Sequence, residues 1–250
     1  MDQQTAEEAG NSPDIKKMDA LARLSSKLAH DLNNILGAIE GYATLAMGAV
    51  KAGDPMMEDM QEIRAAVAKA AALNKQLLVF SGRQMMQKKT CSVNEIINGL
   101  PEAAAGSGAA GIELRLQPDL PGLTADPVHL GKAISNLLAN AREAMPGGGT
   151  VVISSSFLRL EGAAVKAPKP EEAGAGFVKI SVKDSGAGIS GENYERLFEP
   201  LFSTKDKKSG AGLGLSTVYG VVKQHNGWVE AKTEPGRGSE FSVFLPVNAK

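Results

Sequence analysis

Apolar residues recur at every third or fourth position through the first third of the chain, which is the spacing of one face of an α-helix. The pattern predicts two long helices between Asp14 and Met86, separated by the glycine and the proline of Ala49–Pro55. The apolar positions are Leu21, Leu24, Leu28, Leu32, Ile35, Ile39, Tyr42 and Ala46 in the first helix and Met60, Ile63, Val67, Ala70, Leu73, Leu77 and Phe80 in the second. Two such helices joined by a short loop form an antiparallel hairpin. One hairpin leaves its apolar stripe in water, so we expect two copies to pack as a four-helix bundle, which makes the protein a homodimer.

Helical and strand patterns are mixed beyond a polar stretch at Ser81–Thr90, which is expected to be a linker. We expect helices at Val93–Leu100, Val128–Met145, Gly191–Phe198 and Gly214–His225, and strands at Ile112–Gln117, Thr150–Ser156, Val178–Asp184, Trp228–Thr233 and Glu240–Pro246. This order favours an α+β fold in which helices cover one face of a mixed sheet. The stretch Glu161–Gly176 is rich in Ala, Pro, Gly and Glu and is expected to be the disordered tip of a hairpin.

The length of 250 residues suits two modest domains, and 43% hydrophobic with 22% charged residues is an ordinary globular composition. We expect a disordered tail at residues 1–13, a helical hairpin at 14–86 and an α+β domain at 87–250.

Charge and cysteine content exclude several classes of partner and site. The formal net charge is -1 and no long Lys/Arg run is present, so nucleic acid is not expected as a partner. Cys91 is the only cysteine, which excludes a disulfide within the chain and a cysteine-rich zinc site and fits a reducing compartment. The polar start carries no signal region, and the longest weakly polar stretch, Gly37–Val50, is shorter than the roughly 18 residues of a membrane span. We expect a soluble, cytoplasmic protein without a membrane span in this chain.

The first candidate for chemistry is His30, which Asp31 follows in the middle of a predicted helix. A neutral imidazole has one ring nitrogen with a free lone pair, and a carboxylate that holds the proton of the other nitrogen makes the ring a better nucleophile. Asn34 lies one helical turn further on the same face, where its amide could orient a water or an attacking group. A solvent-facing polar pair without a function is the alternative interpretation.

Two asparagines four residues apart form the second candidate. Asn136 and Asn140 point the same way from an apolar helix, and buried amides need polar partners, so a polar cavity is implied. The amide oxygen of Asn140 could bind a Mg²⁺ ion that keeps most of its water and phosphate ligands. The alternative is a pair of amides that only cap a neighbouring loop.

Two glycine-rich segments complete the set. Asp184 ends a predicted strand and is followed by Gly186 and Gly188, which allow a tight turn close to a ligand, and its carboxylate could accept a hydrogen bond from the amino group of adenine. Further on, lysines precede alternating glycines that open into a helix at Gly214, and a helix N-terminus attracts phosphate. Each segment alone also fits an ordinary turn or loop, and the second matches neither the Walker loop nor the Rossmann fingerprint.

The order of these motifs resembles the two-component sensor histidine kinases. The motifs are the histidine-bearing hairpin, NLLANA, DSGAGI, FEPLFSTK, GAGLGLS and GRGSEFSVFLP, and they extend from about Met18 to Pro246. The HDLNN sequence and the LLVFSGRQ that ends the second helix are most similar to the subgroup whose histidine is followed by aspartate and two asparagines. The resemblance implies a dimerisation and histidine-phosphotransfer domain, followed by an ATP-binding domain of the Bergerat (GHKL) fold.

The resemblance also implies an activity: autophosphorylation from Mg·ATP and transfer of the phosphoryl group to an aspartate of a response regulator receiver domain, with a phosphatase activity toward that regulator as a further possibility. By motif, His30 is the phospho-acceptor, Asp31 its acid/base helper and Asn34 the residue that serves dephosphorylation of the regulator. The residues implied to bind ATP are Asn136, Asn140 (also the Mg²⁺ ligand), Asp184, Gly186, Gly188, Ile189, Phe198, Phe202, Lys205, Gly210, Gly212, Leu213, Gly214, Leu215 and Ser239. Of these, Phe198 and Phe202 would anchor a mobile lid.

Three positions depart from the family pattern. Ala211 and Ser239 each stand where threonine is common, and Gly82 stands where arginine is usual. Two other functions remain open at this point. An ATPase of the gyrase, chaperone and mismatch-repair type would carry a water-activating glutamate at the position of Asn136. A phosphotransfer protein with a degenerate ATP domain would bind no ATP.

Overall fold

The computed structural model describes residues 15–51, 54–81, 85–104, 110–159, 176–204 and 212–247. The expected tail at 1–13, most of the expected hairpin tip at 161–176, and the unusual Gly82 and Ala211 lie outside the described residues. No helix in the described ranges is both long enough and apolar enough to cross a membrane.

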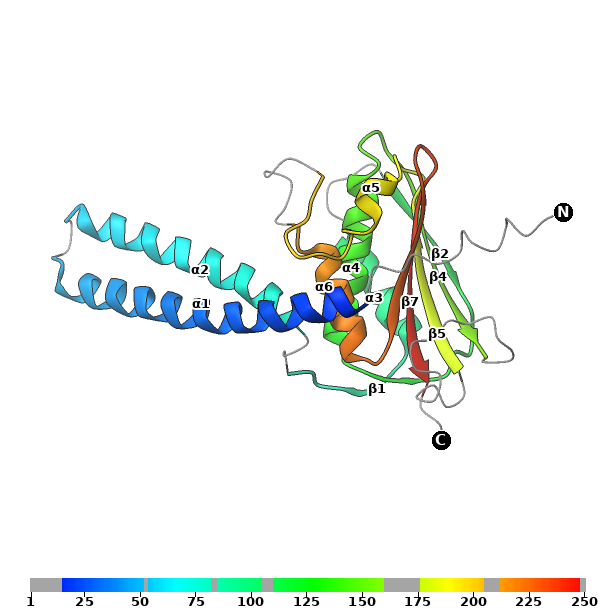
Figure 1. Cartoon of the computed structure of the whole chain (residues 1–250), viewed down its shortest axis with the longest axis horizontal. Coiled ribbons are helices and arrows are strands. Elements are labelled where there is room, and N and C mark those ends of the chain that lie inside the picture. Colours follow the sequence, from blue (N-terminus) through cyan, green and yellow to red (C-terminus); the bar gives the residue numbers. More distant parts are fainter. Residues whose placement is uncertain are drawn as a thin grey trace.

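The first two helices, α1 (Ile15–Ala49) and α2 (Met56–Phe80), form the expected antiparallel hairpin, which projects from the rest of the molecule (Figure 1). Asp54 caps the start of α2, because its Oδ1 accepts the N–H of Met56 at 2.9 Å and so satisfies one of the free donors of the first turn. The two helices face each other through small side chains, with Ser26, Ala29 and Ala43 buried. The larger apolar residues of the predicted stripe are exposed in this single chain; they are Leu24, Leu28, Leu32, Ile35, Ile39 and Tyr42 on α1 and Ile63 and Leu73 on α2.

The second part of the molecule is built on a five-stranded mixed sheet with the order β2 (Ala110–Leu116), β4 (Gly149–Leu158), β5 (Gly176–Lys183), β7 (Gly238–Val247), β6 (Trp228–Glu234). Only β2 and β4 run parallel. Helices α3 (Val93–Ala104), α4 (Pro127–Glu143) and α6 (Gly214–Gln224) cover one face of this sheet, and the short α5 (Gly191–Tyr194) lies at one end (Figure 1). The predicted α+β architecture with helices on one face is confirmed.

The hydrophobic core lies between this sheet and its helices. Val151 and Ile153 alternate along β4 and are completely buried, as a strand with one covered face requires. The facing residues of the helices are also buried and include Leu130, Ile134, Leu137 and Leu138 of α4 and Val218, Val221 and Val222 of α6.

Two local predictions were wrong, and one strand was not predicted. The expected linker Ser81–Thr90 ends in a strand, β1 (Lys89–Cys91), which pairs with the equally unexpected β3 (Leu123–Ala125) in a small antiparallel sheet. Pairs of three-residue strands are too short to show an alternating pattern. The expected helix Gly191–Phe198 ends at Tyr194, because the following N–H groups bond three residues back, as that of Leu197 does to Tyr194.

The hairpin ends against helix α6. Phe80, the last residue of α2, is 1% exposed, and its ring lies 6.0 Å from that of Tyr219. A side chain at Gly220 would overlap the Val79 carbonyl and the backbone of Phe80, so the absence of a Cβ lets the two helices approach. The amide of Gln224 also donates to the Val79 carbonyl at 3.4 Å.

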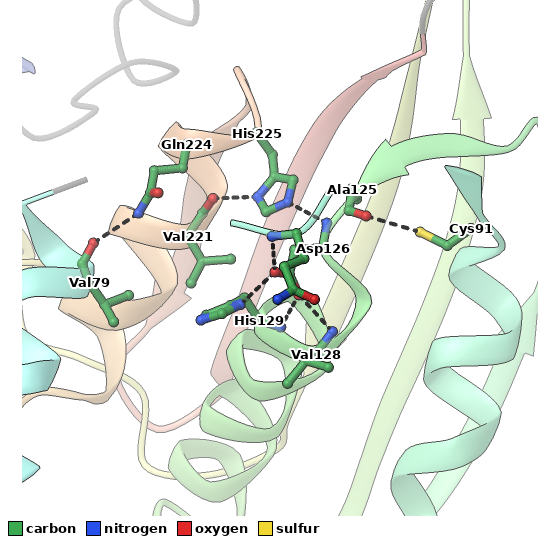
Figure 2. Close-up of polar contacts among 10 residues, drawn as sticks. Val79, Cys91, Ala125, Asp126, Val128, His129, Val221, Gln224 and His225 are labelled. Atoms are coloured by element: carbon green, nitrogen blue, oxygen red, sulfur yellow. Dashed lines mark hydrogen bonds and ion pairs between the residues drawn. The ribbon is translucent and has the colours of Figure 1, made fainter. Parts of the chain in front are cut away.

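A buried polar network lies beside this junction (Figure 2). Asp126 caps α4 by accepting the N–H groups of Val128 and His129, and its other oxygen accepts the N–H of Gln87 from the segment that follows the hairpin. His225, at the end of α6, accepts the N–H of Asp126 through Nε2 at 2.9 Å and therefore carries its proton on Nδ1, which donates to the Val221 carbonyl at 2.7 Å. The network joins the ends of two helices to the connecting segment.

The network shifts the pKa values of two of its members downward. Burial lowers the pKa of His225, because a charged imidazole would lose its hydration and could no longer accept the N–H of Asp126. Burial alone would raise the pKa of Asp126, but the N–H groups of His129 and Gln87 and the ring of His129 outweigh it, and the net pKa is lowered.

We predict that the free energy of unfolding decreases as the pH falls below about 6.5, the ordinary histidine value from which the His225 pKa is lowered. Over that range the unfolded chain binds a proton that the folded chain does not. The stabilisation that neutral His225 provides is therefore complete above about pH 6.5, and it is lost as the pH falls toward the lower pKa of the folded state. Below about 4, protonation of Asp126 adds a second loss. Urea unfolding between pH 8 and 5 should show a smaller pH dependence for His225→Gln than for the wild type. Equal dependences would contradict the assignment to His225.

Candidate functional site

The hairpin presents His30 on the outer face of α1, with 75% of its side chain exposed. Its Nδ1 lies 3.4 Å from Oδ1 of Asp31 and 3.5 Å from Nδ2 of Asn34. A proton on Nδ1 is held by the carboxylate of Asp31, whereas a lone pair on Nδ1 accepts the Asn34 amide. In the first tautomer the lone pair of Nε2 points away from both partners, which is the arrangement of a nucleophile with an adjacent base.

A cavity of about 610 Å³ lies on the helical side of the second part of the molecule. Its wall combines residues of α4, the segment after β5, the first turn of α6 and the start of β7, with one residue of the hairpin. The lining residues are Leu73, Asn136, Ala139, Asn140, Glu143, Ala144, Pro146, Asp184, Ala187, Gly188, Ile189, Asn193, Leu197, Phe202, Ser203, Thr204, Gly212, Leu213, Gly214, Leu215, Thr217, Ser239 and Phe241. This volume is within the range of small-ligand sites.

The two asparagines of α4 meet the beginning of α6 in this wall. The amide of Asn136 donates to the Gly214 carbonyl at 3.3 Å, and a Cβ at Gly214 would lie 3.6 Å from Oδ1 of Asn140. Among the residues that the structure describes, no side chain caps α6, while the hydroxyls of Ser216 and Thr217 donate back to the Leu213 carbonyl. The free N–H groups of the first turn and the positive end of the helix dipole therefore favour an anionic group in the cavity.

Asp184 is held rigidly at the end of β5, at 4% exposure. Its Oδ1 accepts the N–H of Gly186 at 2.8 Å and that of Ser239 at 3.2 Å. The hydroxyl of Ser239 lies 2.9 Å from Oγ1 of Thr233 on the neighbouring strand, so serine keeps the hydroxyl contact that threonine would make there. These bonds fix the orientation of a buried carboxylate that borders the cavity.

Two glycines of the wall have conformations that other residues rarely adopt. Gly188 has φ +68°, and a Cβ there would overlap the Glu234 carbonyl. Gly212 has φ +65°, and a Cβ there would lie 2.8 Å from the carbonyl oxygen of Phe202. Both positions bring the backbone close to another segment of the chain, whereas the sequence pattern predicted a close approach to a ligand.

Most of the residues predicted to bind ATP meet in this one cavity. They are Asn136, Asn140, Asp184, Gly188, Ile189, Phe202, Gly212, Leu213, Gly214, Leu215 and Ser239. Gly186 packs instead against Ala144, and Phe198 lies in the hydrophobic core with its ring 6.1 Å from that of Tyr219. Lys205 and Gly210 lie outside the described residues. His30, Asp31 and Asn34 are on the hairpin and do not line the cavity.

Sequence reasoning missed several wall residues. Glu143 could have been found, because it lies one helical turn beyond Asn140 on the same face of α4. Leu73 could not, since it belongs to α2 and reaches the cavity only through the packing of the hairpin.

Comparison with known proteins identifies relatives of this chain. Residues 125–249 match the model of the family "Histidine kinase-, DNA gyrase B-, and HSP90-like ATPase". The chain is 36% identical over 233 residues to Sensor kinase CckA of Brucella abortus, covering 92% of this chain and 25% of that protein. It is 31% identical over 236 residues to Sensor histidine kinase ZraS of Escherichia coli, covering 93% of this chain and 47% of that protein. The chain thus spans between a quarter and about half of the length of these relatives.

The fold also matches a solved structure. Full-length ShkA in complex with AMPPNP superimposes with a TM-score of 0.61 at 22% identity, covering 91% of this chain and 46% of that one. At this identity the likeness concerns the fold, and it includes both the helical part and the sheet.

We predict that Gly188→Ala raises the dissociation constant for ATP at least about tenfold, because the left-handed conformation costs an alanine about 1–2 kcal/mol and the new Cβ displaces the Glu234 segment. Gly191→Ala is the matched control, since a Cβ there meets open space. Calorimetric titration with ATP measures both. Similar affinities for the two variants would show that the backbone at Gly188 does not shape the ligand site.

Proposed function

Since this chain belongs to the histidine kinase-, DNA gyrase B- and HSP90-like ATPases, as the catalytic core of a two-component sensor histidine kinase, we propose that it phosphorylates its own His30 from ATP and passes the phosphoryl group to an aspartate of a response regulator. The domain division at residues 14–86 and 87–250 is part of the proposal. The single cysteine, Cys91, favours the cytoplasm as the compartment.

One observation carries this proposal: a single chain holds both an exposed imidazole with a carboxylate at its Nδ1 and a cavity suited to a nucleotide. An ATPase of the gyrase type has no use for the first feature and needs a water-activating glutamate where Asn136 stands. A phosphotransfer scaffold has no use for the second feature, whose asparagines, aspartate and glycines are intact.

In the first step, the Nε2 lone pair of His30 attacks the γ-phosphorus of ATP. The Nε2–P bond forms while the bond from phosphorus to the β–γ bridging oxygen breaks, and ADP leaves with that electron pair. The proton on Nδ1 remains hydrogen-bonded to Asp31, which offsets the positive charge that develops on the ring. Such a transfer depends mainly on positioning and on charge neutralisation.

The cavity residues hold the nucleotide for this step. Asp184 accepts the hydrogen bond of the adenine amino group, and the N–H groups at the start of α6 bind phosphate oxygens. Asn140 fits a magnesium ligand, because its amide lies in the cavity wall beside that anion site, and a carboxamide oxygen is a ligand that Mg²⁺ accepts. The ion would neutralise phosphate charge. The described residues contain no cluster of three or more His, Cys, Asp or Glu able to hold a metal.

In the second step, a carboxylate of the response regulator attacks the phosphorus and His30 leaves as the neutral imidazole. The exposure of His30 gives the regulator access to the phosphoryl group. A phosphatase activity toward the same regulator is a second proposal, favoured by the amide of Asn34, which lies 3.5 Å from the His30 ring and can orient a water on the face that the regulator would occupy.

We further propose that the protein is a homodimer through the hairpin. The exposed apolar residues Leu24, Leu28, Leu32, Ile35, Ile39 and Tyr42 continue along α1, and the α1–α2 contact buries small side chains instead. A second hairpin would cover this stripe and complete a four-helix bundle.

The central test is incubation with Mg²⁺ and γ-labelled ATP, beside a His30→Gln variant. The wild type should gain acid-labile, base-stable label and the variant none, while the variant still binds ATP because its cavity is unchanged. A wild type that binds ATP and gains no label would overturn the autokinase activity. Absence of ATP binding would favour the phosphotransfer scaffold.

For the homodimer, we predict that Ile35→Glu raises the dimer dissociation constant at least about a hundredfold, since burying an isoleucine contributes about 2 kcal/mol on each of two subunits. Sedimentation equilibrium measures the constant. The control is Lys69→Glu, which changes charge at an exposed polar position of α2. A dimer of wild-type strength in Ile35→Glu would exclude this face of α1 from the interface.

A further inference from the structure

Asn74, in the second hairpin helix, is a polar residue that the proposed function does not yet use. It is 1% exposed. Its amide nitrogen donates to the Ala29 carbonyl at 2.6 Å and to Oδ1 of Asn33 at 2.7 Å. Ala29 precedes His30 and Asn33 follows it by three residues, so both bonds reach the helical turn that carries the phospho-acceptor.

The buried residues of α1 beside this turn, Ser26 and Ala29, have small side chains. Small side chains make fewer van der Waals contacts than large ones, so they hold the rotation of α1 less firmly. A directed amide bond tolerates far less movement, which is how a buried asparagine fixes the register of a coiled coil. Because successive residues of a helix are about 100° apart, even a partial rotation of α1 would redirect the imidazole.

Stability alone does not explain an asparagine at position 74. Its Oδ1 is buried and has no hydrogen-bond partner among the residues that the structure describes. An unpaired buried acceptor destabilises the folded state, whereas an apolar residue of similar size would not. The Ala29 carbonyl can also keep its ordinary bond within the helix, since a carbonyl oxygen has two lone pairs.

The neighbouring residue connects the same turn of α2 to the cavity in which we propose that the nucleotide binds. Leu73 lines the cavity, and Asn74 bonds the turn of His30. One turn of α2 therefore contacts the two places between which the phosphoryl group has to move.

We propose that Asn74 is a positioning residue for the phosphorylation of His30: by bonding Ala29 and Asn33 it fixes the rotation of α1, so that the imidazole is presented in line with the γ-phosphate of ATP. The inference rests on the proposed autokinase activity and adds a residue to it. Asn74 touches neither the phosphate nor the imidazole and acts through the backbone of α1.

The test uses Asn74→Leu in the full chain. Leucine keeps the volume and removes both donors, and Asn33 is exposed, so its freed oxygen can bond water. We expect kcat for autophosphorylation to fall at least tenfold, with the KM for ATP within twofold of the wild type and a melting temperature that is equal or higher. A residue with only a structural role would instead lower the melting temperature and leave kcat unchanged in the folded protein.

A second measurement distinguishes the positioning of the His30 imidazole from its chemical reactivity. Phosphoramidate is a small phosphoryl donor that needs no nucleotide site, and it should label His30 equally fast in the wild type and in Asn74→Leu. Asn33→Ala should reproduce part of the loss with ATP, and the double variant Asn33→Ala/Asn74→Leu should lose no more than Asn74→Leu alone, because both changes remove the same bond.

Arg64→Met is the matched control, because it breaks another polar contact across the hairpin, the 2.8 Å ion pair with Glu40, away from His30. This variant should keep kcat for autophosphorylation within twofold of the wild-type value. An unchanged kcat in Asn74→Leu, or an equal loss in Arg64→Met, would overturn the inference while leaving the autokinase intact. A wild type that gains no label from ATP would refute the proposed function itself.

Discussion

Helix α6 is the element on which the rest of the arrangement depends, because it belongs to both halves of the molecule. Its first turn borders the cavity and meets Asn136 and Asn140, and further along it packs against the end of the hairpin at Gly220. Its last residues enter the buried network around Asp126 through His225. A shift of α6 would therefore displace residues at the anion site, at the hairpin and at the connecting segment together.

The two halves are stabilised in different ways, and the difference suits a transfer between them. The second part has an apolar core between sheet and helices, which gives its cavity a rigid wall and a buried, bonded carboxylate at Asp184. The hairpin has small side chains between its helices and an exposed apolar stripe. Near His30 the directed hydrogen bonds of Asn74 connect its two helices, and the proposed phospho-acceptor lies on this half.

The exposure of His30 and the burial of Asp184 also fit the roles that we propose for these residues. A phospho-acceptor has to meet a nucleotide and then a second protein, so its ring cannot be enclosed. A carboxylate that recognises one amino group gains from burial, because a hydrogen bond is electrostatically stronger away from water. The same chain meets both requirements by placing one residue on a projecting helix and the other at a strand end within a wall.

The sequence by itself determined the hairpin, the order of most elements and the helices on one face of the sheet, because these depend on local periodicity. Glycine and amide motifs marked six residues that line the cavity, Asn136, Asn140, Asp184, Gly188, Gly212 and Gly214, and the resemblance to a known family added Ile189, Phe202, Leu213, Leu215 and Ser239. Tertiary structure alone decided that Leu73 joins the cavity wall, that Asn74 bonds the turn of His30, and that β1 pairs with β3. It also placed His225 against Asp126, ninety-nine residues away in sequence. Contacts between distant segments depend on how whole elements pack. The pattern along a helix does not indicate which surface a given leucine or asparagine will contact.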